Sequence, residues 1–300
     1  MIDRIGSQQM SRNFLADLNR NQYDIAGLQR QLATGKRLNN PSDDPIGVGI
    51  ALGIRDDLAS VEAWQRNIAD SQSWLSATDN ALNGYQDIIQ RAQELAVQGG
   101  NGTLSAGGRL QLATEVLALR DQVVETGNAS LGGRYLFGGT QTNRQPMDGS
   151  IPGLAAPVNT GLLTREVAQG QVLSVNITAD RLVDPAGATP DIFQTLTDFA
   201  AALQAGDLQA ISGTTMTELD AHLDNVNMLR GEIGAKVNRL DLTDQRHSLD
   251  NITRQQQQSE IEDTDIAEAI TNLKMRETVL QASMAVGART MQRSLVDFIS

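Results

Sequence analysis

Paired acidic residues near the N-terminus are the first place in this chain where chemistry could be sought. Asp43 and Asp44 stand together between Pro41 and Pro45, and adjacent carboxylates can bind calcium. A calcium loop needs several more oxygen ligands at set spacing, and the neighbouring residues do not supply them. The sequence therefore favours a helix cap, in which Ser42, Asp43 or Asp44 accepts hydrogen bonds from the next helix while the prolines fix the turn.

A second candidate is the pair Asp244 and His247, one helical turn apart, which would suit acid–base catalysis. No nucleophile or glycine-rich site accompanies this pair, so a polar contact between helices is the favoured interpretation. Residues 99–102, Gly-Gly-Asn-Gly, lack the preceding strand and the Lys-Ser/Thr of a phosphate loop, and are predicted to end a helix. We therefore predict that the chain is not an enzyme and holds no metal and no cofactor.

The composition argues against several functional classes. The chain has 300 residues, no cysteine, two histidines and a net charge of −12. Structural zinc and thiol catalysis are thus disfavoured, and the negative charge argues against nucleic acid or an anionic membrane as the main partner. The sequence has neither a long apolar run that could span a membrane nor the apolar core of a cleavable signal peptide. We expect a soluble chain that does not use the general secretory route.

The seven prolines determine where long helices can form. They lie at positions 41 and 45 and between residues 146 and 190, and proline interrupts helices. The predicted helices are 3–33, 46–98, 104–126, 191–205, 214–258 and 261–299. Residues 141–190 are rich in glycine and proline, and 171–178 alternate like a half-buried strand. This segment is predicted to be a small β-rich insert.

Apolar residues recur every seven positions along the longest predicted helix, which is typical of a coiled coil. The members of this series are Ile54, Val61, Ile68, Leu75, Leu82, Ile89 and Ala96. A second series runs through the predicted helix 214–258, with Leu219, Val226, Ile233 and Leu240. His247 and Arg254 continue that series at positions where apolar residues would be easier to explain.

The two terminal helices each carry a narrow apolar stripe. A lone helix with one such stripe is marginal in water. We therefore predict that the terminal helices pair with each other, pack against neighbouring molecules, and are loose until they do so. The predicted assembly residues are Phe14, Leu18, Ile25, Leu28 and Leu32 near the N-terminus, and Ile266, Ile270, Leu273, Leu280, Met284, Met291 and Phe298 near the C-terminus.

Four separated motifs resemble the flagellin superfamily of bacterial flagellar axial proteins. The first, residues 32–45, reads Leu-Ala-Thr-Gly-Lys-Arg-Leu-Asn-Asn-Pro-Ser-Asp-Asp-Pro, and its prolines are more similar to the hook-associated members than to filament flagellin. The other three are residues 132–140, 261–266 and 294–300. The residues that match the motifs are Gly35, Lys36, Arg37, Asn39, Pro41, Asp43, Asp44, Pro45, Tyr135, Phe137, Glu262 and Asp263.

This resemblance implies a mainly α fold, with long coiled-coil helices from both chain ends and a small β-rich inserted domain. The terminal domain would comprise 1–40 and 260–300, the helical-bundle domain 41–140 and 191–259, and the insert 141–190.

The resemblance also implies a structural role in the ring that joins the hook-associated region of the flagellum to its filament. Such a subunit would leave the cell by flagellar type III export. Its implied partners are the first hook-associated protein, flagellin, copies of itself and an export chaperone, with no nucleic acid and no membrane insertion. Filament flagellin, with the same fold, is the nearest alternative, and a cytoplasmic coiled-coil scaffold is a more remote one.

Overall fold

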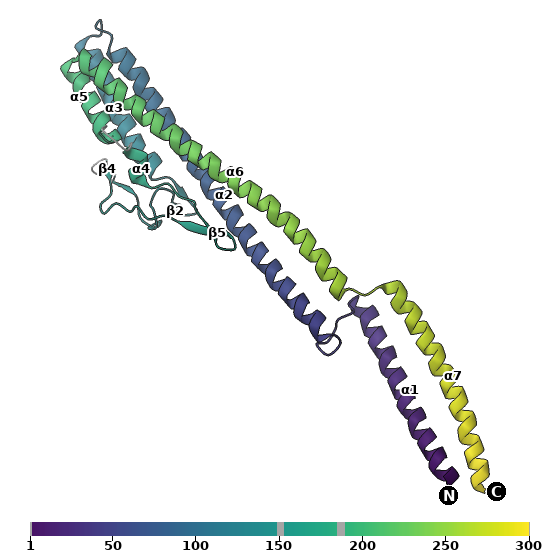
Figure 1. Cartoon of the computed structure of the whole chain (residues 1–300). Coiled ribbons are helices and arrows are strands. Elements are labelled where there is room, and N and C mark those ends of the chain that lie inside the picture. Colours follow the sequence, from purple (N-terminus) through teal and green to yellow (C-terminus); the bar gives the residue numbers. More distant parts are fainter. Residues whose placement is uncertain (1, 149–152, 185–189, 300) are drawn as a thin grey trace. The chain divides into compact units, whose positions relative to one another are not determined.

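The computed structural model describes residues 2–148, 153–184 and 190–299, with the side chains of residue 9 and of residues 12–288 within these ranges. The described chain is mainly α-helical, as the sequence predicts (Figure 1). The helices are α1 (Ile2–Thr34), α2 (Pro45–Gly99), α3 (Ala106–Gly127), α4 (Ala179–Val183), α5 (Ile192–Ala205), the π-helical turn η1 (Ala210–Thr215), α6 (Met216–Glu262) and α7 (Ile266–Ile299).

The chain divides into two compact units. Residues 1–60 and 249–300 form the terminal unit, and residues 61–248 form the central unit. Within the terminal unit, α1 and α7 lie side by side and run antiparallel, so that both chain termini lie at the same end of this helix pair (Figure 1). Helices α2 and α6 each contribute residues to both units.

The core of the central unit follows the seven-residue repeats. Side chains of the first series from Val61 to Ala96 are buried, as are Leu219, Val226, Ile233 and Leu240 of α6. Helix α5 packs against α3, and it begins where the Asp191 carboxylate accepts a hydrogen bond from the backbone N–H of Gln194 at 2.8 Å. It ends at Gly206, whose φ of 74° is a left-handed conformation that glycine adopts without steric cost.

The two polar residues in the second series have specific partners. The His247 ring stacks on Trp64, with the centroids 5.5 Å apart, and its Nε2 lies 2.7 Å from the Val167 carbonyl oxygen. Arg254 forms an ion pair with Asp57 within the terminal unit. These contacts explain why a heptad position can hold a polar side chain in this chain.

Three antiparallel hairpins connect α3 to α4. They pair β1 (Ser130–Leu131) with β2 (Arg134–Tyr135), β3 (Met147–Asp148) with β4 (Gly153–Leu154), and β5 (Thr164–Ala168) with β6 (Gln171–Ser174). The alternation predicted for 171–178 continues after β6, where Val175 and Ile177 are buried. The β-structure is thus small, as predicted, but it begins before residue 141.

The predicted boundary between the last two helices is wrong by a few residues. Helix α6 continues through the glutamines at 255–258 and ends at Glu262. The break falls at residues 263–265, where the Asp265 carboxylate accepts hydrogen bonds from the backbone N–H groups of Ala267 and Glu268. Glutamine has a good helix propensity, so a polar glutamine run gives no reason for a helix to stop.

His222 gives the central unit a predictable sensitivity to acid. Burial lowers the pKa of this histidine to about 4 from its ordinary value of 6.5. Because the unfolded chain binds the proton more readily, stability should fall as the pH drops from 6.5 toward 4. We expect the free energy of unfolding to decrease by about 2 kcal/mol between pH 7 and pH 5 from this group. Denaturant titrations of the wild type and of His222→Gln should show this loss in the wild type alone.

Candidate assembly interface

Two of the motif segments, residues 35–37 and 261–264, meet in the terminal unit. Lys36 pairs with Asp263 in an isolated antiparallel β-bridge. The backbone N–H of Arg37 donates to the Glu262 carbonyl at 2.6 Å, and that of Thr264 donates to the Gly35 carbonyl at 3.0 Å. Two motifs more than 220 residues apart in the sequence therefore form one structure, which we call the linker clamp (residues 35–37 and 261–264).

The charge at the centre of the linker clamp is the Glu262 carboxylate. This residue is only 2% exposed, and it forms ion pairs with Lys36 and, at 2.7 Å, with Arg55 of α2. The Gln258 side-chain amide donates a further hydrogen bond at 3.2 Å. These donors compensate the Glu262 carboxylate for the loss of its hydrating water. Since they come from different elements, the carboxylate links α2, α6 and the segment between α1 and α2.

The acidic pair of the first motif shapes the turn between α1 and α2. The Asp43 carboxylate accepts backbone hydrogen bonds from Asn40 at 2.8 Å and Asn39 at 3.1 Å, and these bonds lower the pKa of Asp43. The Asp44 carboxylate accepts from the Gly47 N–H at 2.9 Å and caps α2, whose first residue is Pro45. Asp44 thus caps the next helix, as the cap interpretation predicts, whereas Asp43 accepts hydrogen bonds from the turn that precedes that helix.

Other residues of the first motif line a hollow beside this turn. Asn39 and Pro41 line it together with Leu38, Leu52 and the linker-clamp residue Glu262. The volume of the hollow is about 160 Å³. Asn39 also donates to the Lys36 carbonyl at 2.7 Å. The motif residues of the N-terminal half therefore stabilise the turn between α1 and α2 and the linker clamp.

The predicted assembly residues divide into two groups in the structure. Phe14, Leu18, Ile25, Leu28 and Leu32 of α1 are half-buried, as are Leu273 and Leu280 of α7. Ile266, Ile270 and Met284 are exposed, and the side chains of Met291 and Phe298 lie outside the described residues. Residues that the periodicity missed also lie in the α1–α7 contact. Asn21 and Gly287 are buried there, and a Cβ added to Gly287 would lie 2.4 Å from the Phe14 ring.

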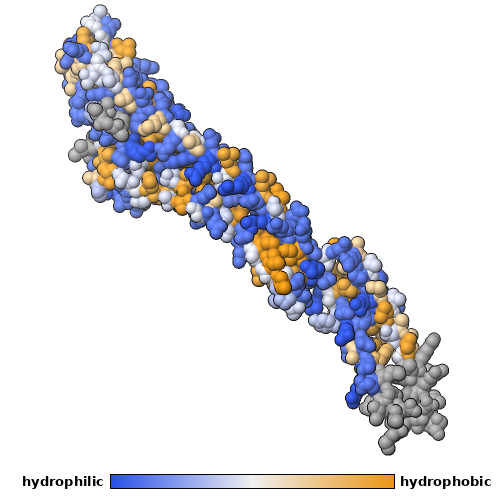
Figure 2. Space-filling model, in the orientation of Figure 1, coloured by the Kyte–Doolittle hydropathy of each residue, from blue (hydrophilic) through white to orange (hydrophobic). Residues whose placement is uncertain are grey.

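Apolar surface is also present at the start of α2. Ile46 is 77% exposed, and Ile50 and Leu52 are about half exposed. Figure 2 shows orange surface over the first turns of this helix. A contiguous patch of exposed apolar residues with polar residues around it is typical of a protein–protein interaction site.

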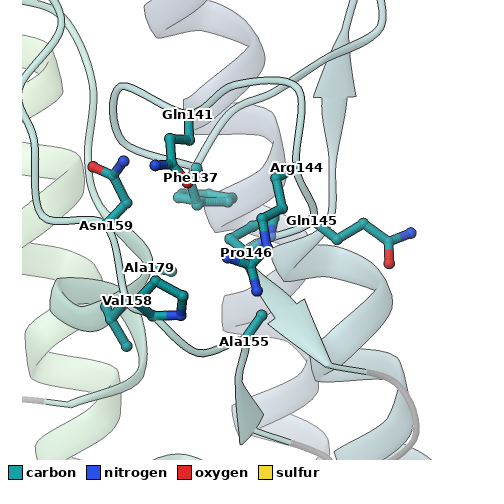
Figure 3. A pocket seen from close by; sticks show the side chains of 11 residues that line it. Phe137, Gln141, Arg144, Gln145, Pro146, Ala155, Val158, Asn159 and Ala179 are labelled. Atoms are coloured by element: carbon teal, nitrogen blue, oxygen red, sulfur yellow. The ribbon is translucent and has the colours of Figure 1, made fainter.

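The motif of residues 132–140 lies in the central unit, where it contributes Phe137 to the core. Phe137 is 1% exposed, and its carbonyl accepts a hydrogen bond from the Ala179 N–H at 3.1 Å. The Tyr135 N–H donates to the Thr142 carbonyl at 2.8 Å. Phe137 lines a cavity with Arg144 and Asn159 (Figure 3), but at about 20 Å³ this cavity has room for little more than one water molecule.

The candidate catalytic pair is not assembled in the central unit. His247 lies against Trp64 and the Val167 carbonyl, whereas Asp244 accepts a hydrogen bond from the Gln65 amide at 3.5 Å. Among the described side chains, no group of three or more histidines and carboxylates is arranged to hold a metal ion. Within the described helices, none combines the length and apolar character needed to cross a membrane.

Comparison with known families decides the relationship of the chain. The bacterial flagellin N-terminal helical region matches residues 5–142, and the bacterial flagellin C-terminal helical region matches residues 216–299. The chain belongs to the flagellin family. Both parts of the linker clamp, most of α1 and all of α7 lie within these two matched regions. The predicted resemblance is confirmed.

Individual flagellin-family relatives match over most of their length. Flagellar hook-associated protein 3 of Escherichia coli (strain K12) is 30% identical over 93% of this chain and 94% of its own length. The protein of the same name from Salmonella typhimurium is 29% identical over 93% of this chain and 94% of its length. Flagellin of Bacillus subtilis is 27% identical over 97% of both chains.

Solved flagellin-family structures have the same fold. The crystal structure of Bacillus cereus FlgL superimposes with a TM-score of 0.58 at 24% identity, and covers 69% of this chain and 99% of that one. The flagellar junction protein FlgL from Legionella pneumophila gives a TM-score of 0.59 at 15% identity, covering 70% of this chain and 100% of that one. At these identities the likeness concerns the fold.

Proposed function

We propose that this chain is a structural subunit of the bacterial flagellum that forms the junction ring between the hook-associated region and the filament. The observation that carries the proposal is the 30% identity with a flagellar hook-associated protein 3 across almost the whole of both chains. The two prolines around Asp43 and Asp44 support it, because a motif with these prolines is more similar to the hook-associated members of the family than to filament flagellin.

The proposed mechanism uses the surfaces described above. The α1–α7 pair, with Ile266, Ile270 and Met284 exposed, packs against neighbouring copies and against the first hook-associated protein. The start of α2 offers a further apolar contact, and flagellin adds to the opposite face of the ring. The insert, residues 141–190, faces outward and sets the spacing or the surface chemistry of the ring. The same proposal divides the chain into three domains. The terminal domain comprises 1–40 and 260–300, the helical bundle 41–140 and 191–259, and the insert 141–190.

The route of the chain out of the cell follows from the same role. Such a subunit passes unfolded through the flagellar type III export channel and acts outside the cell. An export chaperone covers the apolar stripe of α7 before export. A structural role of this kind requires no catalytic activity, and we propose none for this chain.

A seeded assembly assay, read by electron microscopy, tests the proposal. Purified chain is added to hook ends that carry the first hook-associated protein, and separately to short filament seeds. We expect it to cap the hook ends without elongation and to allow flagellin to add afterwards. Ile50→Glu should reduce capping, because it places a charge on exposed apolar surface of α2, whereas Ile50→Val should not. Absence of capping by the wild-type chain would refute the junction role.

Filament flagellin is the second candidate, favoured by the 27% identity with Bacillus subtilis flagellin over 97% of both chains. The same assay separates the two functions. Long filaments grown from the seeds by this chain alone would establish flagellin and exclude the junction ring.

A further inference from the structure

The apolar seam of α1 contains one polar residue. Its members are spaced alternately by four and three residues, as in a coiled coil. They are Phe14, Leu18, Asn21, Ile25, Leu28 and Leu32. Seven-residue steps from Leu18 reach only apolar residues, and those from Phe14 reach Asn21 and then Leu28. The Asn21 amide therefore lies in the middle of an otherwise apolar seam.

Asn21 is the most deeply placed member of this seam. Its exposed fraction is 7%, whereas the five apolar members are half-buried. Its side-chain Nδ2 donates a hydrogen bond to the Arg276 carbonyl of α7 at 3.2 Å. Its Oδ1 is buried and has no hydrogen-bond partner among the described residues. Next to this contact, the Arg276 guanidinium lies 3.3 Å from the Asp24 carboxylate.

A continuous apolar seam would not distinguish between partners. Contacts between leucine and isoleucine side chains are non-directional, so they tolerate shifted registers and pairing with other apolar helices. A buried amide is different, because an arrangement that leaves its N–H groups without an acceptor is penalised. The Arg276 carbonyl offers an acceptor at one point along α7.

We propose that Asn21 makes the pairing of α1 specific, restricting this helix to α7 of its own chain in one register. The linker clamp holds only the ends of the two helices near residues 36 and 263. Asn21 lies about four helical turns away from the clamp along α1, and it fixes the part of the pair that the clamp does not reach. The unsatisfied Oδ1 makes this pairing weaker than an all-apolar seam would be, so the residue exchanges strength for specificity.

Cross-linking of the purified chain tests this inference without any flagellar partner, so its outcome is independent of the proposed junction role. The natural chain has no cysteine, so introduced cysteines are the only reactive thiols. Cysteines at positions 24 and 276, whose side chains meet in the structure, are joined with a short bifunctional maleimide. The same protein carrying Asn21→Leu is compared with it at equal concentration. A protein with a single cysteine at position 24 reports pairing between chains.

We expect the natural amide to give mainly intramolecular product. Asn21→Leu should lower the intramolecular yield at least threefold and raise the intermolecular yield of the single-cysteine protein by a similar factor. Asn21→Gln, which keeps an amide, should restore part of the natural distribution. Ala16→Leu, which adds a leucine at an exposed position of α1 outside the seam, should change neither yield. Unchanged yields in Asn21→Leu would overturn the proposal.

Discussion

Replacement of Phe137 by alanine is expected to lower the free energy of unfolding of the central unit by about 3–5 kcal/mol. The ring is 1% exposed, so its removal loses the burial of an aromatic side chain and leaves a cavity beside the small one already present. The surrounding structure relaxes only partially around such a cavity, so most of the cost remains. Urea denaturation followed by far-ultraviolet circular dichroism measures the change.

The exposed Leu162 provides the matched control for Phe137. It belongs to the same connecting region, and Leu162→Ala should change stability by no more than about 0.5 kcal/mol. If Phe137 instead served assembly directly, Phe137→Ala would spare the unfolding transition and reduce assembly alone. That result would contradict the structural role described here.

Acid should release the linker clamp through Glu262. Burial, the largest single influence, raises the pKa of this carboxyl, but hydrogen bonds from Arg55, Lys36 and Gln258 together outweigh it. The net result is a pKa of about 2, against an ordinary value of 4.5. Since the folded-state pKa is the lower one, the carboxylate stabilises the fold fully above about pH 4.5, and this contribution is lost as the pH falls through 2.

The expected size of this contribution is about 3 kcal/mol at neutral pH. Glu262→Gln removes the charge and keeps the shape, so it should destabilise the terminal unit by that amount at pH 7. The difference from wild type should shrink to nearly zero near pH 2. Hydrogen exchange of the amides in residues 30–60 and 249–275, read by mass spectrometry, follows this unit directly.

Glu277 controls for charge removal in the same unit. It pairs with Lys274 at 3.0 Å within α7, at the protein surface. Exposed pairs of this kind contribute little, so Glu277→Gln should change protection by less than about 0.5 kcal/mol at any pH. A pH-independent effect of Glu262→Gln would show that the clamp does not depend on the carboxylate charge.

Periodicity predicted the helices well because burial along a helix repeats with the turn. The series from Val61 to Ala96 recurs on one face of α2, and every member of it is buried. Glu262 shows the limit of this reasoning. It belongs to one of the four motifs, but nothing in the local sequence indicates its ion pairs with Lys36 and Arg55. Those contacts depend on how segments far apart in the sequence meet.

The α1–α7 contact was only partly predictable for a similar reason. Leu273 and Leu280 follow the apolar stripe and are half-buried, whereas Ile266, Ile270 and Met284 continue it and are exposed. One partner helix covers a narrower arc than the stripe occupies. Gly287 and Asn21 lie in the contact because a bulky ring needs a small neighbour and an amide needs an acceptor. Hydrophobicity patterns carry neither kind of information.

The linker clamp also has a consequence for the length of the chain between its two halves. The bridge between Lys36 and Asp263 closes residues 37–262 into a loop whose ends are held by local bonds. The entropic cost of closing a loop grows only with the logarithm of its length, by about 0.6 kcal/mol for each doubling. Residues can therefore be added to the hairpins between α3 and α4 with only a small increase in the free energy needed to close the linker clamp. A chain built in this way can vary its middle while both of its ends keep the same anchorage.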